Sequence, residues 1–301
     1  MTDVDEQPSV TQVPATAAEA AELARRHGLV RIDRNPSLPE YLRRLWARRA
    51  FVVELATARA YARNQNNYLG QAWAALNPLL LAGSYLLIFG LLLKTNRGVG
   101  NFVGFLTIGI FIFAFIASTT TSGAKSIQSN QALVRGVRFP RAALPISVAL
   151  SEILTLLPAL VVLLILLPIP GISGEPIQVK WALLPGAVLL LFVFCSGVAL
   201  IAARLVSAWR DATNVIPVAV RLLRYVSGVF FSITAYAGHG VISQVMQYQP
   251  VAVFLDLARS CLLVEYPLDP VLWAVGAGWA VVFLLVGIVV FWRAEQRYGH
   301  D

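Results

Sequence analysis

The sequence predicts an all-α, polytopic membrane protein with six transmembrane helices. An amphipathic interface helix precedes the first, and two re-entrant half-helices precede the last. Of the 301 residues, 57% are hydrophobic and only 13% are charged, and the mean hydropathy is +0.69. A soluble domain carries about a quarter charged residues, so this composition excludes an ordinary soluble enzyme. The apolar residues also gather in segments long enough to cross a bilayer.

The N-terminal residues 1–37 are polar, with Asp3 and Asp5 where a secretory signal needs basic and then apolar residues. We therefore expect no cleavable signal and a disordered cytoplasmic tail, with a loose surface helix near "ATAAEAAELARR". Residues 298–301 are expected to form a second cytoplasmic tail.

Residues 38–75 are expected to form an amphipathic interface helix and a loop after it. Apolar residues recur at helical spacing over 38–64, and arginines such as Arg43 and Arg59 occupy much of the remaining surface. This pattern predicts a helix at the inner membrane interface with its arginines toward the headgroups. Alternatively, the helix packs on the cytoplasmic surface of the protein itself.

The transmembrane domain is expected over 76–297. Its six spans are predicted near 76–93, 102–121, 143–167, 182–203, 213–235 and 271–292. With the N-terminus inside, eighteen Arg and Lys residues lie on the cytoplasmic side, four lie outside, and Arg221 and Arg224 lie within the fifth span. This bias places both termini in the cytoplasm.

Two further segments of this domain do not span. Residues 236–270 hold two short apolar runs that Gln249-Pro250 separates, which predicts a pair of half-helices re-entering from the outer face. Residues 130–141 form a short basic loop between spans two and three. There Leu133, Val134 and Val137 are predicted to share one helix face, with Arg135 and Arg138 on another and the helix ending at Pro140.

The residues give little support for catalysis, and we expect no catalytic, cofactor or metal site. "TSGAKS" (121–126) has a residue between Gly123 and Lys125, which a P-loop does not allow. Cys195 and Cys261 are expected to be inert packing residues. Glu152, an acid inside the third span, is either functional or a hydrogen-bond partner between helices.

The order of these parts resembles the membrane subunit of an ABC-2 type exporter, in particular the Wzm-like polysaccharide permeases. The resemblance covers about 38–297. It is carried by "YARNQNNYLGQAWAALNPLL" (61–80), by "FPRAALP" (139–145), by "WRDATNVIPVAVRLLRYVSGVFFS" (209–232) and by the proline-split pair. It implies an ABC-2 (type V exporter-like) fold.

The resemblance also implies roles for individual positions. Tyr68, Leu69 and Gly70 match an inner gate; Trp73, Asn77 and Pro78 match the start of span one; Arg210 and Asp211 match a pair before span five. The segment Leu133, Val134, Arg135, Val137, Arg138, Phe139 and Pro140 matches the part that docks on an ATPase, although an ordinary basic loop is the alternative. Gln249, Pro250, Asp256 and Arg259 match an outer gate, with Gln249 in place of the usual Asn.

The expected function is ATP-driven export of a polyprenyl-pyrophosphate-linked glycan. The resemblance implies a homodimer with two Wzt-like P-loop ATPase subunits, which carry the ATP and Mg, so this chain is not expected to be an enzyme. The composition is similar to that of actinobacterial members, such as mycobacterial-type galactan exporters, which suggests a galactan or an O-antigen-like glycan. Alternatives are an ABC-2 exporter of a drug or small lipid, a membrane glycosyltransferase, and a scaffold subunit.

Two sets of residues are candidates for contact with such a cargo. Arg221 and Arg224 are candidates to receive the pyrophosphate and Tyr225 to contact the first sugar, because a guanidinium matches paired phosphate oxygens. Alternatively, these arginines snorkel to the headgroups. The candidate channel aromatics, which could instead face lipid, are Tyr85, Phe89, Phe230, Phe231 and Tyr236.

Overall fold

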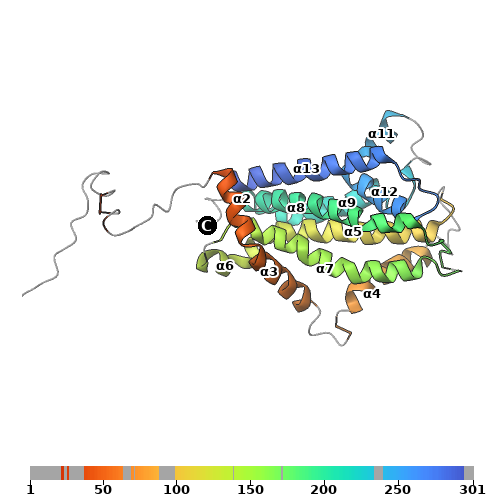
Figure 1. The fold of residues 1–301 in the computed structure, drawn as a ribbon, viewed down its shortest axis with the longest axis horizontal. Helices are drawn as coiled ribbons and strands as arrows, with labels where there is room; N and C mark the ends of the chain where they lie inside the picture. Colours follow the sequence, from red (N-terminus) through yellow and green to blue (C-terminus); the bar gives the residue numbers. More distant parts are fainter. Residues whose placement is uncertain are drawn as a thin grey trace, which may run out of the picture. The chain divides into compact units, whose positions relative to one another are not determined.

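Figure 1 shows the computed structural model of the protein. The structure describes residues 22–23, 26, 37–63, 69–70, 72–87, 99–137, 139–170, 172–233 and 240–294. The chain divides into two units, Met1–Ser37 and Leu38–Asp301. In the first unit, Arg26 and Glu22 form an exposed ion pair one helical turn apart, with 3.5 Å between Nε and Oε1. The predicted tails lie almost wholly outside the described residues.

The secondary structure of the described part of the second unit is entirely helical. The elements are α2 (Leu38–Ala47), α3 (Arg49–Ala62), α4 (Ala72–Leu86), α5 (Phe102–Ala124), η2 (Gln128–Asn130), α6 (Gln131–Gly136), α7 (Ala143–Leu166), η3 (Val179–Leu183), α8 (Leu184–Ala208), α9 (Ala212–Val226), α11 (Val241–Tyr248), α12 (Pro250–Leu262) and α13 (Pro270–Arg293).

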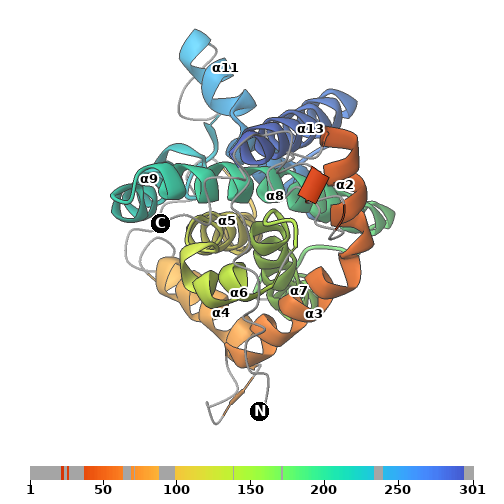
Figure 2. The same ribbon diagram turned by 90° about the vertical axis from the view of Figure 1, so that its left-hand side faces the viewer.

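Four segments in the described part of the chain are long and apolar enough to cross a membrane. They are α5, α7, η3 with α8, and α13, and they lie side by side in Figure 1 and Figure 2. These four correspond to predicted spans two, three, four and six. In α5 most side chains are buried, as expected of a helix that is apolar all round. In α13, by contrast, few are, and its exposed surface is left for lipid or for another chain.

The first predicted span is only partly described. Helix α4 begins at Ala72, before the predicted start at residue 76, and it is described as far as Leu86. Residues 88–98 lie outside the described part. The structure therefore leaves the outer end of this span a prediction.

The prediction of one continuous helix over 213–235 is wrong. Helix α9 ends at Val226 after 15 residues, which span about 23 Å at 1.5 Å per residue. Gly228 then adopts φ +74°, a left-handed conformation that ends helices and that favours glycine. Helix α9 is therefore shorter than the hydrocarbon core of a bilayer, which is about 30 Å thick.

The prediction of a single interface helix over 38–64 is also wrong, because the chain breaks between α2 and α3. Arg48, at the junction, leaves the helical region with φ −96° and ψ 16°. The buried side chains of the pair are Tyr41, Val52 and Ala56, whereas Trp46 is 71% exposed. The pair thus packs on the helices of its own chain, as the alternative interpretation proposed, and leaves other apolar side chains exposed.

The closest packing between helices joins α8 to α13. A Cβ atom built on Gly197 would lie 2.3 Å from the backbone carbon of Phe283, and one built on Gly287 would lie 2.7 Å from the Gly197 carbonyl oxygen. Backbones can approach this closely only where both helices lack a side chain. These two glycines therefore set the distance between α8 and α13.

The predicted split pair after span five is present as α11 and α12. Gln249 is extended, with ψ 145°, and Pro250 is the first residue of α12, a position that tolerates its missing N–H. The indole of Trp279 in α13 donates a hydrogen bond of 3.0 Å to the Tyr248 carbonyl at the end of α11. Re-entry of this pair into the membrane remains a prediction.

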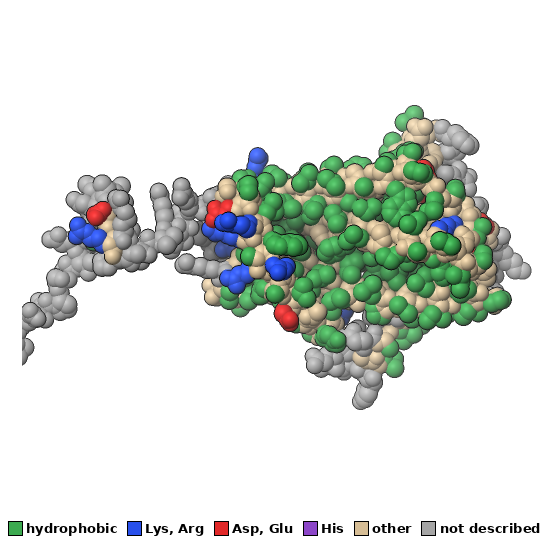
Figure 3. Space-filling view, in the orientation of Figure 1, with side chains coloured by type: hydrophobic (Ala, Val, Ile, Leu, Met, Phe, Trp, Pro, Cys, Tyr) green, Lys and Arg blue, Asp and Glu red, His purple; other side chains and the backbone are tan. Residues whose placement is uncertain are grey.

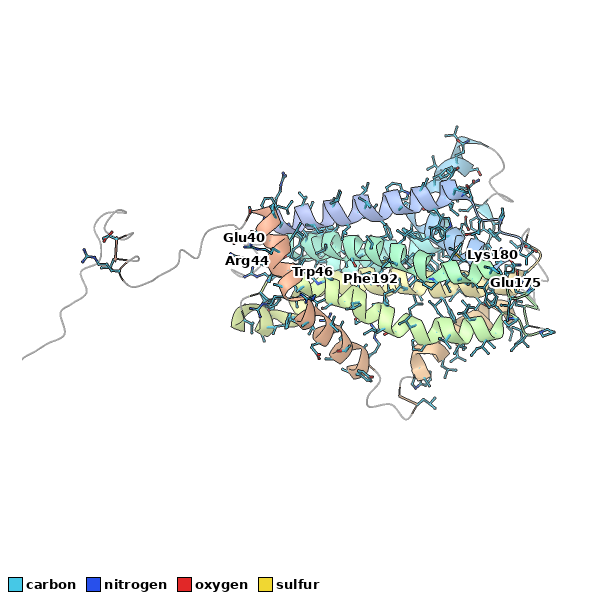
Figure 4. The ribbon with its side chains drawn as sticks, in the orientation of Figure 1. Glu40, Arg44, Trp46, Glu175, Lys180 and Phe192 are labelled. Carbon is cyan, nitrogen blue, oxygen red and sulfur yellow. The ribbon has the colours of Figure 1, made fainter. Side chains whose placement is uncertain are left out.

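Charged side chains of the second unit lie at both of its ends, with a group of them near α2 and α3 (Figure 3 and Figure 4). Figure 3 shows Lys and Arg at that end of the visible face and apolar side chains along the flank of the long helices. Figure 4 places Glu40 and Arg44 at this end, and Glu175 and Lys180 at the opposite end. The end that carries α2 and α3 is the one expected to face the cytoplasm.

Candidate functional site

The contacts of the helix pair α2–α3 with the rest of the second unit include one at each of Tyr41, Phe51 and Arg63. The first is Tyr41 in α2, which is buried against Leu200, Phe291 and neighbouring apolar residues. Its hydroxyl oxygen accepts a hydrogen bond of 3.3 Å from the backbone N–H of Ala142, just before α7. A phenol buried in apolar surroundings needs such a partner. The contact joins α2 to the residues that follow the candidate coupling segment.

The second attachment involves the coupling segment itself. The rings of Phe51 in α3 and Phe139 lie with their centroids 5.1 Å apart, inclined at 52°. Phe139 is half-buried and Pro140 is buried. Movement of this segment would therefore act directly on α3.

The predicted helix in the coupling segment ends earlier than Pro140. Helix α6 stops at Gly136, and Val137 is extended with φ −129° and ψ 136°. Glycine is a poor helix former, and the β-branched Val137 favours extended backbone. Leu133 and Val134 are half-buried, Arg135 and Val137 are exposed, and Arg138 lies outside the described residues. Val137 thus does not continue a helical face with Leu133 and Val134.

The third attachment is a two-pronged ion pair between Arg63, at the end of α3, and Glu152 in α7. Nη1 of Arg63 donates to Oε2 of Glu152 over 2.9 Å, and Nη2 donates to Oε1. The Glu152 side chain is 4% exposed and that of Arg63 is 39% exposed. The hydrogen bond to Glu152 raises the pKa of the Arg63 guanidinium despite its partial burial. The acid that stands alone in the sequence of span three therefore has a cation from another element.

A cavity of about 170 Å³ lies beside this ion pair. Its polar lining includes Arg63, Asn77, Ser118, Glu152 and Thr155. The remaining lining consists of Trp73, Phe111, Ala114, Phe115, Leu156 and Ala159. The cavity thus lies among the end of α3, the start of α4, and the spans α5 and α7. Trp73 and Asn77 are two residues that the family resemblance had singled out.

The candidate inner gate precedes α4. Gly70 has φ +47°, and a Cβ built on it would have no neighbour within 4 Å. The backbone conformation therefore favours glycine at this position, whereas the space within one chain would accept a larger side chain. Leu69 is exposed, and Tyr68 lies outside the described residues. The gating role remains a prediction.

The arginines of α9 differ in their surroundings. Arg221 is exposed, whereas Arg224 is half-buried with its guanidinium carbon 5.1 Å from the centre of the Phe113 ring. Tyr225 is 56% exposed, and its ring centroid lies 5.7 Å from that of Phe230. Within one chain, only Arg221 and Tyr225 of the predicted headgroup site are therefore open to a ligand or to another chain.

The candidate channel aromatics are only partly described. Phe230 is buried in the core of this chain and Phe231 is half-buried. Phe89 and Tyr236 lie outside the described residues, as does the side chain of Tyr85. Phe230 is 5% exposed within one chain, and the role of these aromatics in a channel stays a prediction.

The candidate outer gate is held by a buried arginine. The Arg259 side chain is 2% exposed, and its Nη1 lies 3.0 Å from Oδ1 of Asp256. Nη2 donates to the carbonyl oxygens of Gly228 at 3.0 Å, Val229 at 3.4 Å and Phe105 at 3.5 Å. The guanidinium carbon lies 3.4 Å from the Phe105 ring centre. Arg259 thus connects α12 to α5 and to the turn that ends α9.

Gln249 contributes to the same junction. Its side-chain amide donates a hydrogen bond of 3.0 Å to the Val226 carbonyl at the end of α9. The shorter asparagine that the family pattern has at this position would have less reach. The substitution is therefore consistent with a direct contact between α9 and the break before α12.

Comparison with known proteins places this arrangement of helices in a family. A family model described as "ABC-2 type transporter" matches residues 53–263, which extend from α3 to the end of α12. The chain belongs to the ABC-2 type transporter family.

Two relatives of this ABC-2 chain are each named O-antigen export system permease protein RfbA. A Klebsiella pneumoniae protein of that name is 24% identical over 240 residues, covering 79% of this chain and 89% of the relative. A Myxococcus xanthus protein of that name is 24% identical over 258 residues, covering 85% and 94%. The likeness therefore extends over most of both proteins.

Sequence reasoning missed several contacts that organise the ABC-2 chain. On the side opposite α2, Glu265 accepts hydrogen bonds of 3.1 Å from the backbone N–H groups of Gly100 and Asn101. Glu175 accepts from Asn101 and from the Val264 backbone, and Lys180 donates to the Leu263 and Tyr266 carbonyls. These residues lie just before α5, between α7 and α8, and between α12 and α13. The sequence offered only their charge as a signal.

Proposed function

We propose that this chain is the channel-forming membrane subunit of an ATP-driven exporter of a lipid-linked polysaccharide. The observation that carries the proposal is the likeness to O-antigen export permeases over 79–85% of the chain, within the ABC-2 family. An O-antigen is a polysaccharide, so the cargo of the relatives gives the substrate class. A galactan or another O-antigen-like glycan on a polyprenyl-pyrophosphate carrier fits this class.

The proposed complex contains two copies of this chain and two Wzt-like P-loop ATPase subunits in the cytoplasmic membrane, with both termini inside. ATP and Mg bind to the partner, because the described Lys125 sits at the C-terminal end of α5 and not in a phosphate-binding loop. The segment from Leu133 to Pro140 docks on the ATPase. The contact between Phe139 and Phe51 supports this role, because it would transmit movement of a docked ATPase to α3.

Export requires that the affinity of the chain for its cargo differ between the two states of the transporter. We propose that Arg221 and Tyr225, which α9 leaves open, meet the pyrophosphate and first sugar of the carrier, and that Leu69-Gly70 closes the inner mouth. Arg224 supports this surface from beneath, since its guanidinium lies over Phe113.

The test is depletion of this chain in its native cells, followed by analysis of the glycan lipids on each membrane face. Full-length lipid-linked glycan should accumulate on the inner leaflet and fall at the cell surface. Short, unfinished glycan would identify a glycosyltransferase instead. Unchanged glycan with altered drug or lipid efflux would identify the other exporter class, and loss of glycan enzymes from the membrane would identify a scaffold.

A further inference from the structure

The cavity beside Arg63 and Glu152 is lined within a single chain, between α4, α5 and α7. A volume of about 170 Å³ is below the ~300 Å³ at which drug-sized pockets begin, so the cavity suits a ligand no larger than one small ring.

The charge of the cavity favours a neutral ligand. Arg63 and Glu152 are the only charged residues in its described lining, and they compensate one another. An anion entering the cavity would meet the buried carboxylate of Glu152 and would compete with it for Arg63. Arg59, one helical turn before Arg63, also interacts electrostatically with Glu152, but it does not belong to the described lining, which is itself neutral.

The hydrogen-bonding groups favour a ligand that carries several hydroxyls. An ionised carboxylate has about four lone-pair sites, and the two hydrogen bonds from Arg63 occupy two of those of Glu152. Asn77 supplies an amide that both donates and accepts, and Ser118 and Thr155 supply hydroxyls. A hydroxyl can donate to the carboxylate and accept from the amide at once.

The apolar lining completes the match. Trp73 contributes an indole ring to the lining, while Phe111, Phe115 and Leu156 add further apolar surface. A ligand with hydroxyls on its edge and C–H groups on its face satisfies both kinds of surface. Both features occur together in a single sugar ring.

We propose that this cavity binds one neutral sugar ring, stacked on Trp73 and hydrogen-bonded to Glu152, Asn77 and their neighbours. In the transporter it holds a sugar of the glycan beside the channel, at the point where α3 meets span three. This biological role rests on the proposed function. The binding itself does not, because it depends only on the lining of the cavity.

The test uses the full-length chain in nanodiscs of phosphatidylcholine, which carry no sugar headgroup. Methyl galactofuranoside and methyl galactopyranoside are titrated in one arm and inorganic phosphate in the other, with binding followed by saturation-transfer NMR. We expect the parent to bind a galactoside. Trp73→Ala should raise its dissociation constant at least about tenfold, which corresponds to about 1.4 kcal/mol.

The matched control is Trp46→Ala, which removes an exposed tryptophan of α2 that does not line the cavity. It should leave the constant within about twofold, as expected of a distant site. Asn77→Ala provides a second cavity variant, which should also weaken binding, if Trp73→Ala fails to give a monodisperse, helical protein. Both variants are checked by gel filtration and circular dichroism.

Three results would overturn the inference: binding of phosphate in preference to both galactosides, binding of neither probe, or equal galactoside binding by the parent, Trp73→Ala and Asn77→Ala. The depletion experiment keeps the two proposals apart. Normal glycan export by a parent that binds no galactoside would reject the sugar site alone. Unchanged glycan lipids on depletion would reject the exporter, whatever the cavity binds.

Discussion

The rings of Phe51 and Phe139 lie 5.1 Å apart and join α3 to the segment that we propose as the ATPase contact. At its other end, α3 is followed by Arg63, which is bonded to Glu152 in α7. The 14 residues of α3 extend about 21 Å at 1.5 Å per residue. A rigid helix of that length therefore connects the coupling segment to a point within span three.

Replacing Phe51 by Ala should weaken this connection without preventing insertion into the membrane. An aromatic pair of this kind contributes about 0.5–1.5 kcal/mol beyond its buried area. We expect loss of cargo-stimulated ATP hydrolysis by the complete complex, while basal hydrolysis remains. The matched control is Val53→Ala, which trims an exposed side chain of the same helix. Equal stimulation in both variants would mean that the ring contact transmits nothing.

The Arg63–Glu152 ion pair should show measurable coupling in a double-mutant cycle. Breaking a fully buried pair costs roughly 3–5 kcal/mol. The cost here should be smaller, because the Arg63 side chain is 39% exposed and partly screened by solvent. Arg63→Gln, Glu152→Gln and the double variant are compared by thermal unfolding. We expect the sum of the destabilisations caused by the two single substitutions to exceed the destabilisation of the double variant by about 0.5–3 kcal/mol.

The exposed pair Glu40–Arg44 supplies the control for that cycle. Its side chains are one turn apart on α2, and the same substitutions there should give a coupling of at most about 1 kcal/mol. Additive effects at Arg63 and Glu152 would show that the pair does not hold α3 against α7.

The effect of a substitution at Gly70 should depend on how readily the new residue adopts a positive φ, and not on the size of its side chain. A β-branched residue at φ +47° costs about 1–2 kcal/mol or more, whereas asparagine enters this region far more readily. Because a Cβ at this position has free space in the chain, Gly70→Asn should export glycan close to the parent level, whereas Gly70→Val should be impaired. Surface glycan is the measurement. Impairment by both variants would point to a close approach of a second chain.

Removing Arg259 should loosen the outer helix pair. In Arg259→Met the carbonyls of Gly228 and Val229 lose their donor, and Asp256 loses its cation. We expect Cys261, two residues along α12 and fully buried, to become reactive toward maleimide. Cys195, buried in α8, serves as the internal control and should stay protected. If Cys261 keeps the protection seen in the parent, Arg259 does not hold this junction.

Arg221→Gln and Arg224→Gln should lower cargo-stimulated ATP hydrolysis for different reasons. Arg221 is exposed and should act by binding the carrier, so its replacement should weaken the apparent affinity for the lipid-linked cargo. Arg224 lies over Phe113, so its replacement should lower the thermal stability as well. The two measurements together separate these roles. Unchanged stimulation in the double variant would leave headgroup snorkelling as the account of both arginines.

The long helices could be predicted from the sequence because their signal is local. Spans α5, α7 and α13 begin and end within three residues of the predicted positions, since the run of apolar residues alone fixes a helix in lipid. The break at Gln249-Pro250 was predicted for the same reason, because proline acts on its own neighbours. Nothing distant in the chain is needed for either.

Two features that the sequence did not reveal depend on contacts between residues far apart in the chain. The turn at Gly228 is stabilised by Arg259, 31 residues later, and Glu152 is bonded to Arg63, 89 residues earlier. The end of α6 at Gly136 is different, because that glycine is visible in the sequence and is a weak helix former. Charge and periodicity indicate that these residues are structurally important, but they do not indicate which of them contact one another.

The cap that Arg259 places on the turn after α9 has a consequence for how the protein is made. The carbonyls of Gly228 and Val229 leave the ribosome 31 and 30 residues before the guanidinium that binds them. At roughly 5–20 residues per second, synthesis leaves these groups without Arg259 for about 1.5–6 s. Throughout that interval water or the insertion machinery has to solvate the unfinished end of α9. Its final position in the membrane is settled only after α12 has been translated.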